Sequence, residues 1–266
     1  MNTICKLADI DIYLLYFIDI KTVIRLLTIS KDQNNLIINL DFAKEICALM
    51  QKYGYKYGYK KIIDISAAHN YISLIKWIST FQENEFQYTQ NAIDNAAACG
   101  HIDVLEWFAN SKYEFKYSTN AIDFASEYGH IDVLNWFANS KYEFKYTEDA
   151  IKNASGEGHI DVLNWFANSK YEFKYTEDAI DDAVFTGQIV VLDWFAKSKY
   201  EFKYSDSAIY YALKKKRMEI LKWFDESKYE IKYDERDTYE ILNREYIESL
   251  REYLGPNSRI IKIIDY

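Results

Sequence analysis

The chain has 266 residues, of which 49% are hydrophobic and 27% are charged, and this composition is sufficient to bury an apolar core. A net charge of −9 argues against a general affinity for nucleic acid, because such binding needs a surplus of Lys and Arg to displace counterions. One proline and eight glycines exclude long Pro/Gly linkers and favour helices over a sheet-and-turn architecture.

The cysteines and the N-terminal segment point to the interior of a cell. Cys5, Cys47 and Cys99 are odd in number and widely spaced and lack a CxxC pair, so they predict neither a disulfide framework nor a zinc site. The uncharged run Ile12–Ile18 is too short to cross a bilayer or to act as a signal sequence. We therefore expect an intracellular protein in a reducing compartment, without a membrane span.

Residues 1–40 differ from the rest of the chain, and their apolar residues fall at helical spacing. The order of residues resembles an F-box, the helical module that binds the Skp1 subunit of cullin-based ubiquitin ligases. Leu7 stands where that family has proline, and Gln33 where it has an aromatic residue. The positions that match the acid, the apolar residues and the lysine of an F-box are Asp9, Ile10, Leu14, Leu15, Phe17, Ile18 and Lys31.

The alternative interpretation of residues 1–40 is structural. The end of a repeat array exposes an apolar stacking face, and a short helical segment that covers this face keeps the array from aggregating. The two interpretations are compatible with each other.

Residues 41–87 approach a repeat pattern by degrees. Apolar residues at helix spacing are followed by a Tyr- and Gly-rich run, Tyr53–Tyr59, that ends the helix. Trp77 then precedes Trp107 by 30 residues, and Asn70 stands where later units have glycine. The segment predicts degenerate N-terminal repeats.

The run Gly-His-Ile-Asp-Val-Leu-x-Trp-Phe-Ala recurs in residues 88–232, with Gln188 and Val190 replacing His and Asp in the fourth copy. A fixed interval of 29 residues separates Trp107, Trp136, Trp165, Trp194 and Trp223. A period of this length predicts a repeat array. The regular units are 88–116, 117–145, 146–174, 175–203 and 204–232.

Each unit predicts two helices and an extended connector. Asn, Asp and Ser side chains accept hydrogen bonds from the free amides of a helix start, which predicts N-caps at Asn91, Asn120, Asp149, Asp178 and Ser207. Glycine ends the first helix because it adopts positive φ readily. The Asp-Val-Leu-x-Trp-Phe run predicts a second helix whose apolar stripe includes the tryptophan. The alternating Ser-Lys-Tyr-Glu-Phe-Lys-Tyr tail predicts the connector.

The units resemble ankyrin repeats. In unit 146–174, the family's Thr-Pro-Leu-His is represented by Asp149–Lys152 and its Gly-His-x-x-Val-Val by Gly158–Leu163. The 29-residue unit is shorter than the usual length of about 33 residues, and the deletion falls in the projecting loop. The short unit and the Trp-Phe pair resemble ankyrin-type proteins of giant DNA viruses, of the Mimivirus-like kind. The resemblance covers roughly residues 58–232.

This resemblance implies an all-α ankyrin-repeat solenoid of stacked helix-turn-helix units with helical caps at both ends. Residues 233–266 are expected to form the C-terminal cap, because Leu242, Tyr246 and Leu250 fall at helix spacing and an isoleucine-rich patch follows Gly255-Pro256. We expect a monomer.

No catalytic or metal site is expected. His101, His130 and His159 each precede an Asp by two residues, but stacked repeats place equivalent residues about 10 Å apart, whereas metal ligands lie about 2 Å from the ion. The histidines are interpreted as structural groups that bond the turn between helices. Phosphate-binding loops, HExxH and nucleophile elbows are absent from the sequence. We therefore expect neither an enzyme nor a cofactor.

The resemblance implies that the first helices line a concave binding face, where side chains differ between repeats. The acidic residues Asp94, Asp123, Asp149, Asp178, Asp181 and Asp182 favour a basic partner. Drift on a solvated face is the alternative explanation of the variation. The expected partner contacts are Asp94, Asn95, Phe124, Tyr128, Asn153, Glu157, Asp182, Thr186, Tyr211 and Lys215.

Two functions follow from these expectations. In the first, an F-box-like end holds Skp1 while the array captures a host protein in the host cytoplasm. In the second, a plain ankyrin scaffold binds or sequesters a partner without any ligase. A third reading is a drifting duplicate without a strong partner, as the similarity of units 117–145 and 146–174 allows.

Overall fold

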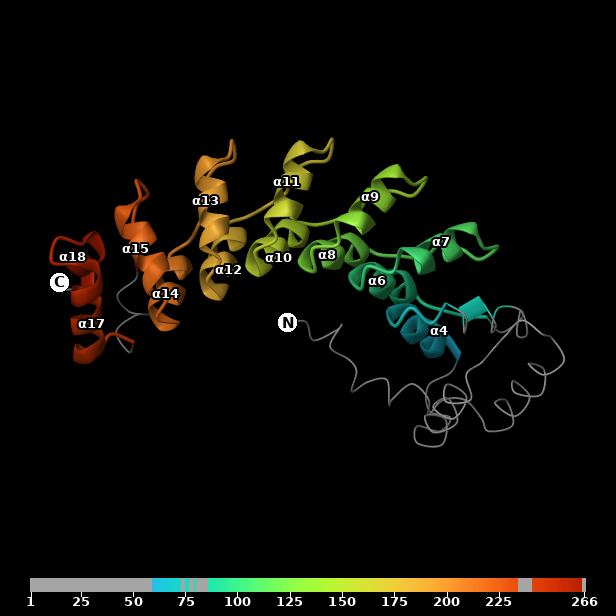
Figure 1. The fold of residues 1–266 in the computed structure, drawn as a ribbon, viewed down its shortest axis with the longest axis horizontal. Helices are drawn as coiled ribbons and strands as arrows, with labels where there is room; N and C mark the ends of the chain where they lie inside the picture. The colour runs from blue at the N-terminus through green and yellow to red at the C-terminus, as the bar shows by residue number, and fades with distance from the viewer. Residues whose placement is uncertain (1–58, 73–74, 77–78, 80–85, 234–240, 265–266) are drawn as a thin grey trace, which may run out of the picture. The chain divides into compact units, whose positions relative to one another are not determined.

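The structure is a computed structural model that describes residues 59–72, 75–76, 79, 86–233 and 241–264 (Figure 1). Every regular element in these ranges is a helix, which confirms the all-α prediction for the described part of the chain. The F-box-like positions Asp9, Ile10, Leu14, Leu15, Phe17, Ile18 and Lys31 lie outside the described residues.

The helices follow one another in short pairs. Their bounds are α4 Tyr59–Ala68, α6 Asn91–Ala98, α7 Ile102–Asn110, α8 Asn120–Glu127, α9 Ile131–Asn139, α10 Asp149–Glu157, α11 Ile160–Asn168, α12 Asp178–Thr186, α13 Ile189–Lys197, α14 Ser207–Lys214, α15 Met218–Glu226, α17 Arg244–Leu254 and α18 Arg259–Ile264.

The chain forms two compact units, one ending at Ala121 and the other beginning at Ile122. In the first unit, α6 packs against α4 and α7. In the second unit, α12 lies between α10 and α14, while α13 contacts both α11 and α15 (Figure 1). Each unit is therefore built from helix pairs that stack on their neighbours in the manner of a helical repeat array.

The predicted N-caps are wrong by two residues. Asn91 is the first residue of α6, and the side chain that caps this helix belongs to Thr89, whose Oγ1 accepts the amide N–H of Asn91 at 3.1 Å. Propensity alone misplaced the cap because both positions carry residues that favour helix starts. The same bond joins Ser118 to Asn120, Thr147 to Asp149, Thr176 to Asp178 and Ser205 to Ser207 at 3.1 to 3.3 Å.

The turns between paired helices have the predicted backbone conformation. Gly158 and Gly187 have φ of 79° and 97°, in the left-handed region that favours glycine. Asn70 and Lys216 replace glycine at the equivalent positions and still have φ of 58° and 54°. The repeats that depart from the Gly-His-Ile-Asp-Val-Leu pattern thus keep the same turn.

The second helices bury their Val, Leu and Phe residues but not their tryptophans. In α11, Val162, Leu163 and Phe166 are buried, whereas Trp165 is half-buried at the surface. Its indole stacks on Phe144 of the preceding connector, with ring centroids 5.3 Å apart. The Val, Leu and Phe residues of the predicted apolar stripe are therefore buried, whereas its tryptophan reaches the surface. The tryptophan instead ties two repeats together along their edge.

A serine ends each second helix of the regular repeats. Ser169 is extended, its hydroxyl donates to the Phe166 carbonyl at 2.9 Å, and its Oγ accepts the N–H of Tyr171 at 3.1 Å. Lys170 and Tyr171 then alternate between exposed and half-buried positions, as the predicted connector requires. Because the serine bonds satisfy the helix end, no positive φ is needed there.

The C-terminal segment forms two helices, α17 and α18, as expected. Tyr246 and Leu250 of α17 are buried, and the Tyr246 hydroxyl donates to the Leu213 carbonyl at 2.9 Å. Arg259 of α18 donates to the carbonyls of Asp225 and Ser227 at 3.0 Å. These bonds satisfy carbonyls at the ends of α14 and α15.

None of the helices in the described part of the chain is long and apolar enough to span a membrane.

Candidate interaction surface

Buried aspartates link the first helices to the connectors that follow them. Asp94 is 2% exposed, and its carboxylate accepts the backbone N–H of Ser118 at 2.8 Å and the Ser118 hydroxyl at 2.6 Å. The prediction that Asp94 is a surface contact is therefore wrong. A carboxylate that accepts two such bonds fixes the same Ser or Thr that caps the next helix.

The same linkage recurs at three other interfaces. It joins Asp64 to Thr89, Asp123 to Thr147 and Asp181 to Ser205. Burial raises the pKa of Asp181 above its ordinary value, although the bonds from Ser205 favour the ionised form. Asp123 and Asp181 are thus internal, as Asp94 is. Half of the six acids expected to attract a basic partner are not on the surface.

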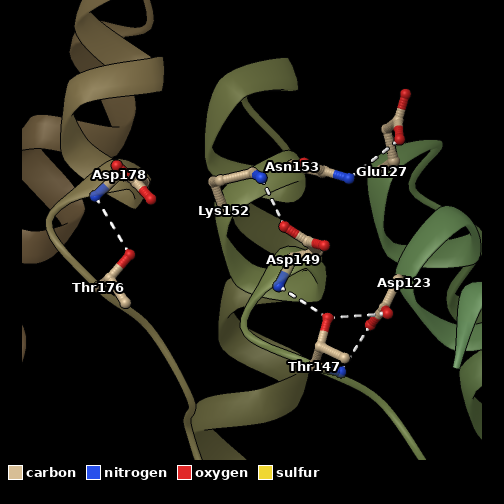
Figure 2. A network of polar contacts seen from close by, with 8 residues as sticks. All are labelled: Asp123, Glu127, Thr147, Asp149, Lys152, Asn153, Thr176 and Asp178. Atoms are coloured by element: carbon tan, nitrogen blue, oxygen red, sulfur yellow. Dashed lines mark hydrogen bonds and ion pairs between the residues drawn. The ribbon is translucent and has the colours of Figure 1, made fainter.

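The linkage is interrupted at unit 146–174, where Lys152 stands in the aspartate position (Figure 2). Lys152 instead pairs with Asp149 of its own helix. The hydrogen bond that Lys152 donates to Asp149 raises the pKa of Lys152, with Asp182 and Asp178 contributing in the same direction. Thr176 still caps α12 through its bond to the Asp178 N–H at 3.3 Å, but it lacks the carboxylate that equivalent residues have.

Beside this interruption, a second polar contact joins α8 to α10. The Asn153 amide donates to Glu127 Oε2 at 3.1 Å (Figure 2). Burial raises the pKa of Glu127, and Glu157 adds to this rise through charge repulsion. Glu157 itself is exposed. The predicted contact Asn153 is thus already engaged with a neighbouring repeat.

The helices α12 and α14 carry side chains at the positions equivalent to Asn153 and Glu157 of α10. A Cβ built on Gly156 lies 3.5 Å from Asp182 Cβ, which shows how closely α10 and α12 approach at this point. The rings of Phe185 and Tyr211 meet edge to face with centroids 5.1 Å apart. Lys215 Nζ lies 4.5 Å from the centroid of the Phe185 ring.

The second compact unit, which begins at Ile122, carries a row of side chains along its first helices that we call the first-helix face of the second unit. This face consists of Phe124, Tyr128, Asn153, Glu157, Asp182, Phe185, Thr186, Tyr211 and Lys215. Glu157, Phe185 and Lys215 are exposed, and the others are half-buried. Thr186 donates its hydroxyl to the Asp182 carbonyl at 2.9 Å, which reduces its capacity to bind a partner. Asn95 is half-buried and belongs to the first unit.

Three residues on or beside this face were not among the expected contacts. Phe185 is 39% exposed, one of few large apolar side chains that reach this exposure in the described residues. Tyr210 accepts a hydrogen bond from Lys214 Nζ at 2.8 Å. A comparison of the repeats could have identified Phe185 and Lys214, because both occupy one variable repeat position. The other repeats have Ala98, Glu127 and Gly156 at this position.

The histidines and their replacements bridge consecutive turns. His101 Nε2 lies 3.0 Å from the Ala68 carbonyl, so this nitrogen carries the proton. Burial lowers the pKa of His101. Arg217 occupies the equivalent position and donates to the Phe185 carbonyl at 3.2 Å. The turn bonded by His101 is that of the preceding repeat, which refines the predicted structural role.

A groove of about 600 Å³ lies between α11 and α13, away from the first helices. Its wall includes Val190, which is 54% exposed, and Trp194, whose indole N–H donates to Asn164 Oδ1 at 2.8 Å. Val190 stands where three other units have aspartate. At this position the wall of the groove is therefore apolar rather than acidic.

No cluster of three or more His, Cys, Asp or Glu side chains suited to a metal ion occurs among the described residues. The sequence matches no protein-family model and no curated protein. Evidence for the function of this chain therefore comes from the geometry of its repeats.

Proposed function

We propose that this chain is an ankyrin-type repeat scaffold that binds a partner protein through the first-helix face of its second unit, and that it has no catalytic activity. The 29-residue period, the left-handed turn between paired helices and the extended connector support the ankyrin assignment. We place the protein inside a host cell as a monomer, in line with the resemblance to ankyrin-type proteins of giant viruses.

One observation carries the binding proposal. Buried positions repeat almost unchanged from unit to unit, while the first-helix face carries a different side chain at nearly every step, such as Glu157, Thr186 and Lys215 at one position. A rigid scaffold with variable, partly apolar side chains is the usual construction of a protein-binding surface.

A matched pair of charge variants tests this proposal. The double variant Glu157→Arg with Asp182→Arg alters the face, and Glu172→Arg with Glu201→Arg makes the same charge change on exposed connector residues. After affinity purification and mass spectrometry, we expect the set of partners to change with the first pair and to stay the same with the second. Partners that respond equally to both pairs would contradict the assignment of this face.

We propose a substrate adaptor for an SCF-type ubiquitin ligase as a second candidate, favoured by the F-box-like spacing from Asp9 to Lys31. In this case Skp1 co-purifies with the chain and is lost when Leu14, Leu15 and Ile18 are changed to Asp. Skp1 that survives these changes argues against the adaptor. A wild-type purification without Skp1 leaves the plain scaffold.

A further inference from the structure

Aromatic and basic side chains gather where α12 and α14 end. Lys214 Nζ lies 5.0 Å from the centroid of the Tyr210 ring, and Lys215 Nζ lies 4.5 Å from that of Phe185. The ring of Tyr211 contacts the rings of both Phe185 and Tyr210, with centroids 5.1 and 5.4 Å apart. We call these five residues the aromatic–lysine patch.

The charge of the first-helix face reverses at this patch. Lys215 occupies the position that Glu157 holds in unit 146–174, and Lys214 occupies the position of Glu127 in unit 117–145. Both lysines are exposed. The patch therefore presents two cations on a chain whose net charge is −9.

The patch offers both an apolar platform and preorganised cations. Phe185 is 39% exposed, so a partner side chain has apolar surface to cover. Lys214 is held by its hydrogen bond to the Tyr210 hydroxyl. Ordering a long side chain before binding reduces the entropy lost when a carboxylate pairs with it.

We propose that the aromatic–lysine patch binds an acidic peptide segment with an aromatic or large aliphatic anchor. This inference rests on the protein-binding function proposed above and names the chemistry of the partner. The anchor packs on Phe185 and Tyr211 while flanking Asp or Glu residues pair with Lys214 and Lys215. It replaces the expectation of a basic partner, because Asp94, Asp123 and Asp181 are buried.

Peptide selection on the immobilised full-length chain tests the proposal. We expect displayed random peptides to be enriched in Asp and Glu around an aromatic or leucine residue. An enriched peptide, synthesised with a fluorescent label, should bind about tenfold more weakly to Phe185→Ala and to Lys214→Glu with Lys215→Glu. Its affinity should also fall as salt is added, because the pairs are solvent-exposed.

The control is Lys170→Glu with Lys228→Glu. These lysines are exposed and lie over Tyr171 and Tyr229 at 5.3 and 5.6 Å, so the variant makes the same charge change at the same type of contact. Peptide affinity should be unchanged in this variant. Circular dichroism and thermal unfolding establish that each variant is folded before binding is measured.

Three results would overturn the proposal. The first is a selection that enriches basic or uncharged peptides, or no peptide at all. The second is an acidic peptide that binds the patch variants and the control equally well. The third is a single-stranded RNA oligonucleotide that binds as tightly as the peptide and is weakened by the lysine changes but not by Phe185→Ala, which would assign the patch to a polyanion. A selective change of partners in Glu157→Arg with Asp182→Arg would still support the scaffold function.

Discussion

At the scale of single residues, a buried carboxylate joins each linked pair of repeats. Asp123 is 3% exposed and accepts the Thr147 N–H and hydroxyl, both at 2.9 Å. One side chain thus satisfies a connector amide and positions the hydroxyl that caps α10. Loss of this carboxylate leaves two partly buried donors without their acceptor.

We expect Asp123→Ala to lower the free energy of unfolding by about 2–3 kcal/mol, because it leaves buried donors unsatisfied. Asp149→Ala is the matched control, since its side chain is 50% exposed and pairs with Lys152 of its own helix. This change should cost about 0.5–1 kcal/mol. Urea unfolding measures both, and equal costs would show that the buried linkage contributes nothing special.

His101 makes stability depend on pH. Burial lowers its pKa from the ordinary value of 6.5, so the folded chain favours the neutral imidazole. The contribution to stability is therefore full above the unfolded pKa and is lost as the pH falls through the folded pKa.

The variant His101→Gln isolates this effect, because Gln188 already occupies the equivalent position in another repeat. Between about pH 7.5 and 5.5 the wild type should lose more stability than the variant. Urea midpoints at the two pH values provide the measurement. Parallel losses in both proteins would exclude His101 as the titrating group.

At the scale of the helix pair, the turn glycine meets two separate demands. Gly158 has φ of 79°, and a Cβ placed on it lies 2.5 Å from Gln188 Oε1 of the next repeat. The backbone conformation thus favours glycine, and a larger residue would also displace the Gln188 side chain.

Three glycine variants separate these demands. Gly158→Ala should cost about 1–2 kcal/mol, because its φ of 79° and ψ of 21° are left-handed helical and the end of the flexible Gln188 side chain has to move aside. Gly255→Ala should cost about 2–3 kcal/mol, because its φ of 86° and ψ of 164° lie in a region that is essentially restricted to glycine, although no atom lies within 4 Å of the new Cβ. Gly156→Ala, inside α10, should stabilise by about 0.5–1 kcal/mol. Thermal unfolding ranks the three, and any other order would contradict this account.

The sequence predicted the elements well and their interfaces poorly. The 29-residue period and the glycines located both helices of each unit and the turn between them. Periodicity did not distinguish the buried Phe166 from the half-buried Trp165, because both lie on one apolar stripe. It also assigned Asp94 to the surface, since only the structure shows that a serine of the following connector covers it.

At the scale of the whole molecule, the C-terminal helices close the array. Arg259 donates to carbonyls at the end of α15, and Tyr246 donates to one at the end of α14. Because each repeat contacts mainly its neighbours, the loss of an end element should weaken the nearest repeat first.

We therefore expect removal of residues 233–266 to accelerate amide hydrogen exchange in α14 and α15, with a smaller effect on α10 and α11. Exchange monitored by mass spectrometry resolves these peptides. Arg244→Ala, which removes only the exposed pair with Glu248, should leave exchange unchanged. A uniform acceleration along the array would contradict nearest-neighbour coupling.

The uniformity of the repeats also has a kinetic consequence. Residues 131–151 and 160–180 are identical in sequence, so a folding chain shifted by one repeat presents the same second helix and connector at the same place. Residues 152–157 and 181–186, which follow these segments, differ between the two copies. Asn153 donates to Glu127 in the native arrangement, whereas a chain slipped by one repeat would place Asp182 beside Glu127 and bring two carboxylates together. We therefore expect the variable first helices to disfavour the slipped arrangement, whatever partner they bind.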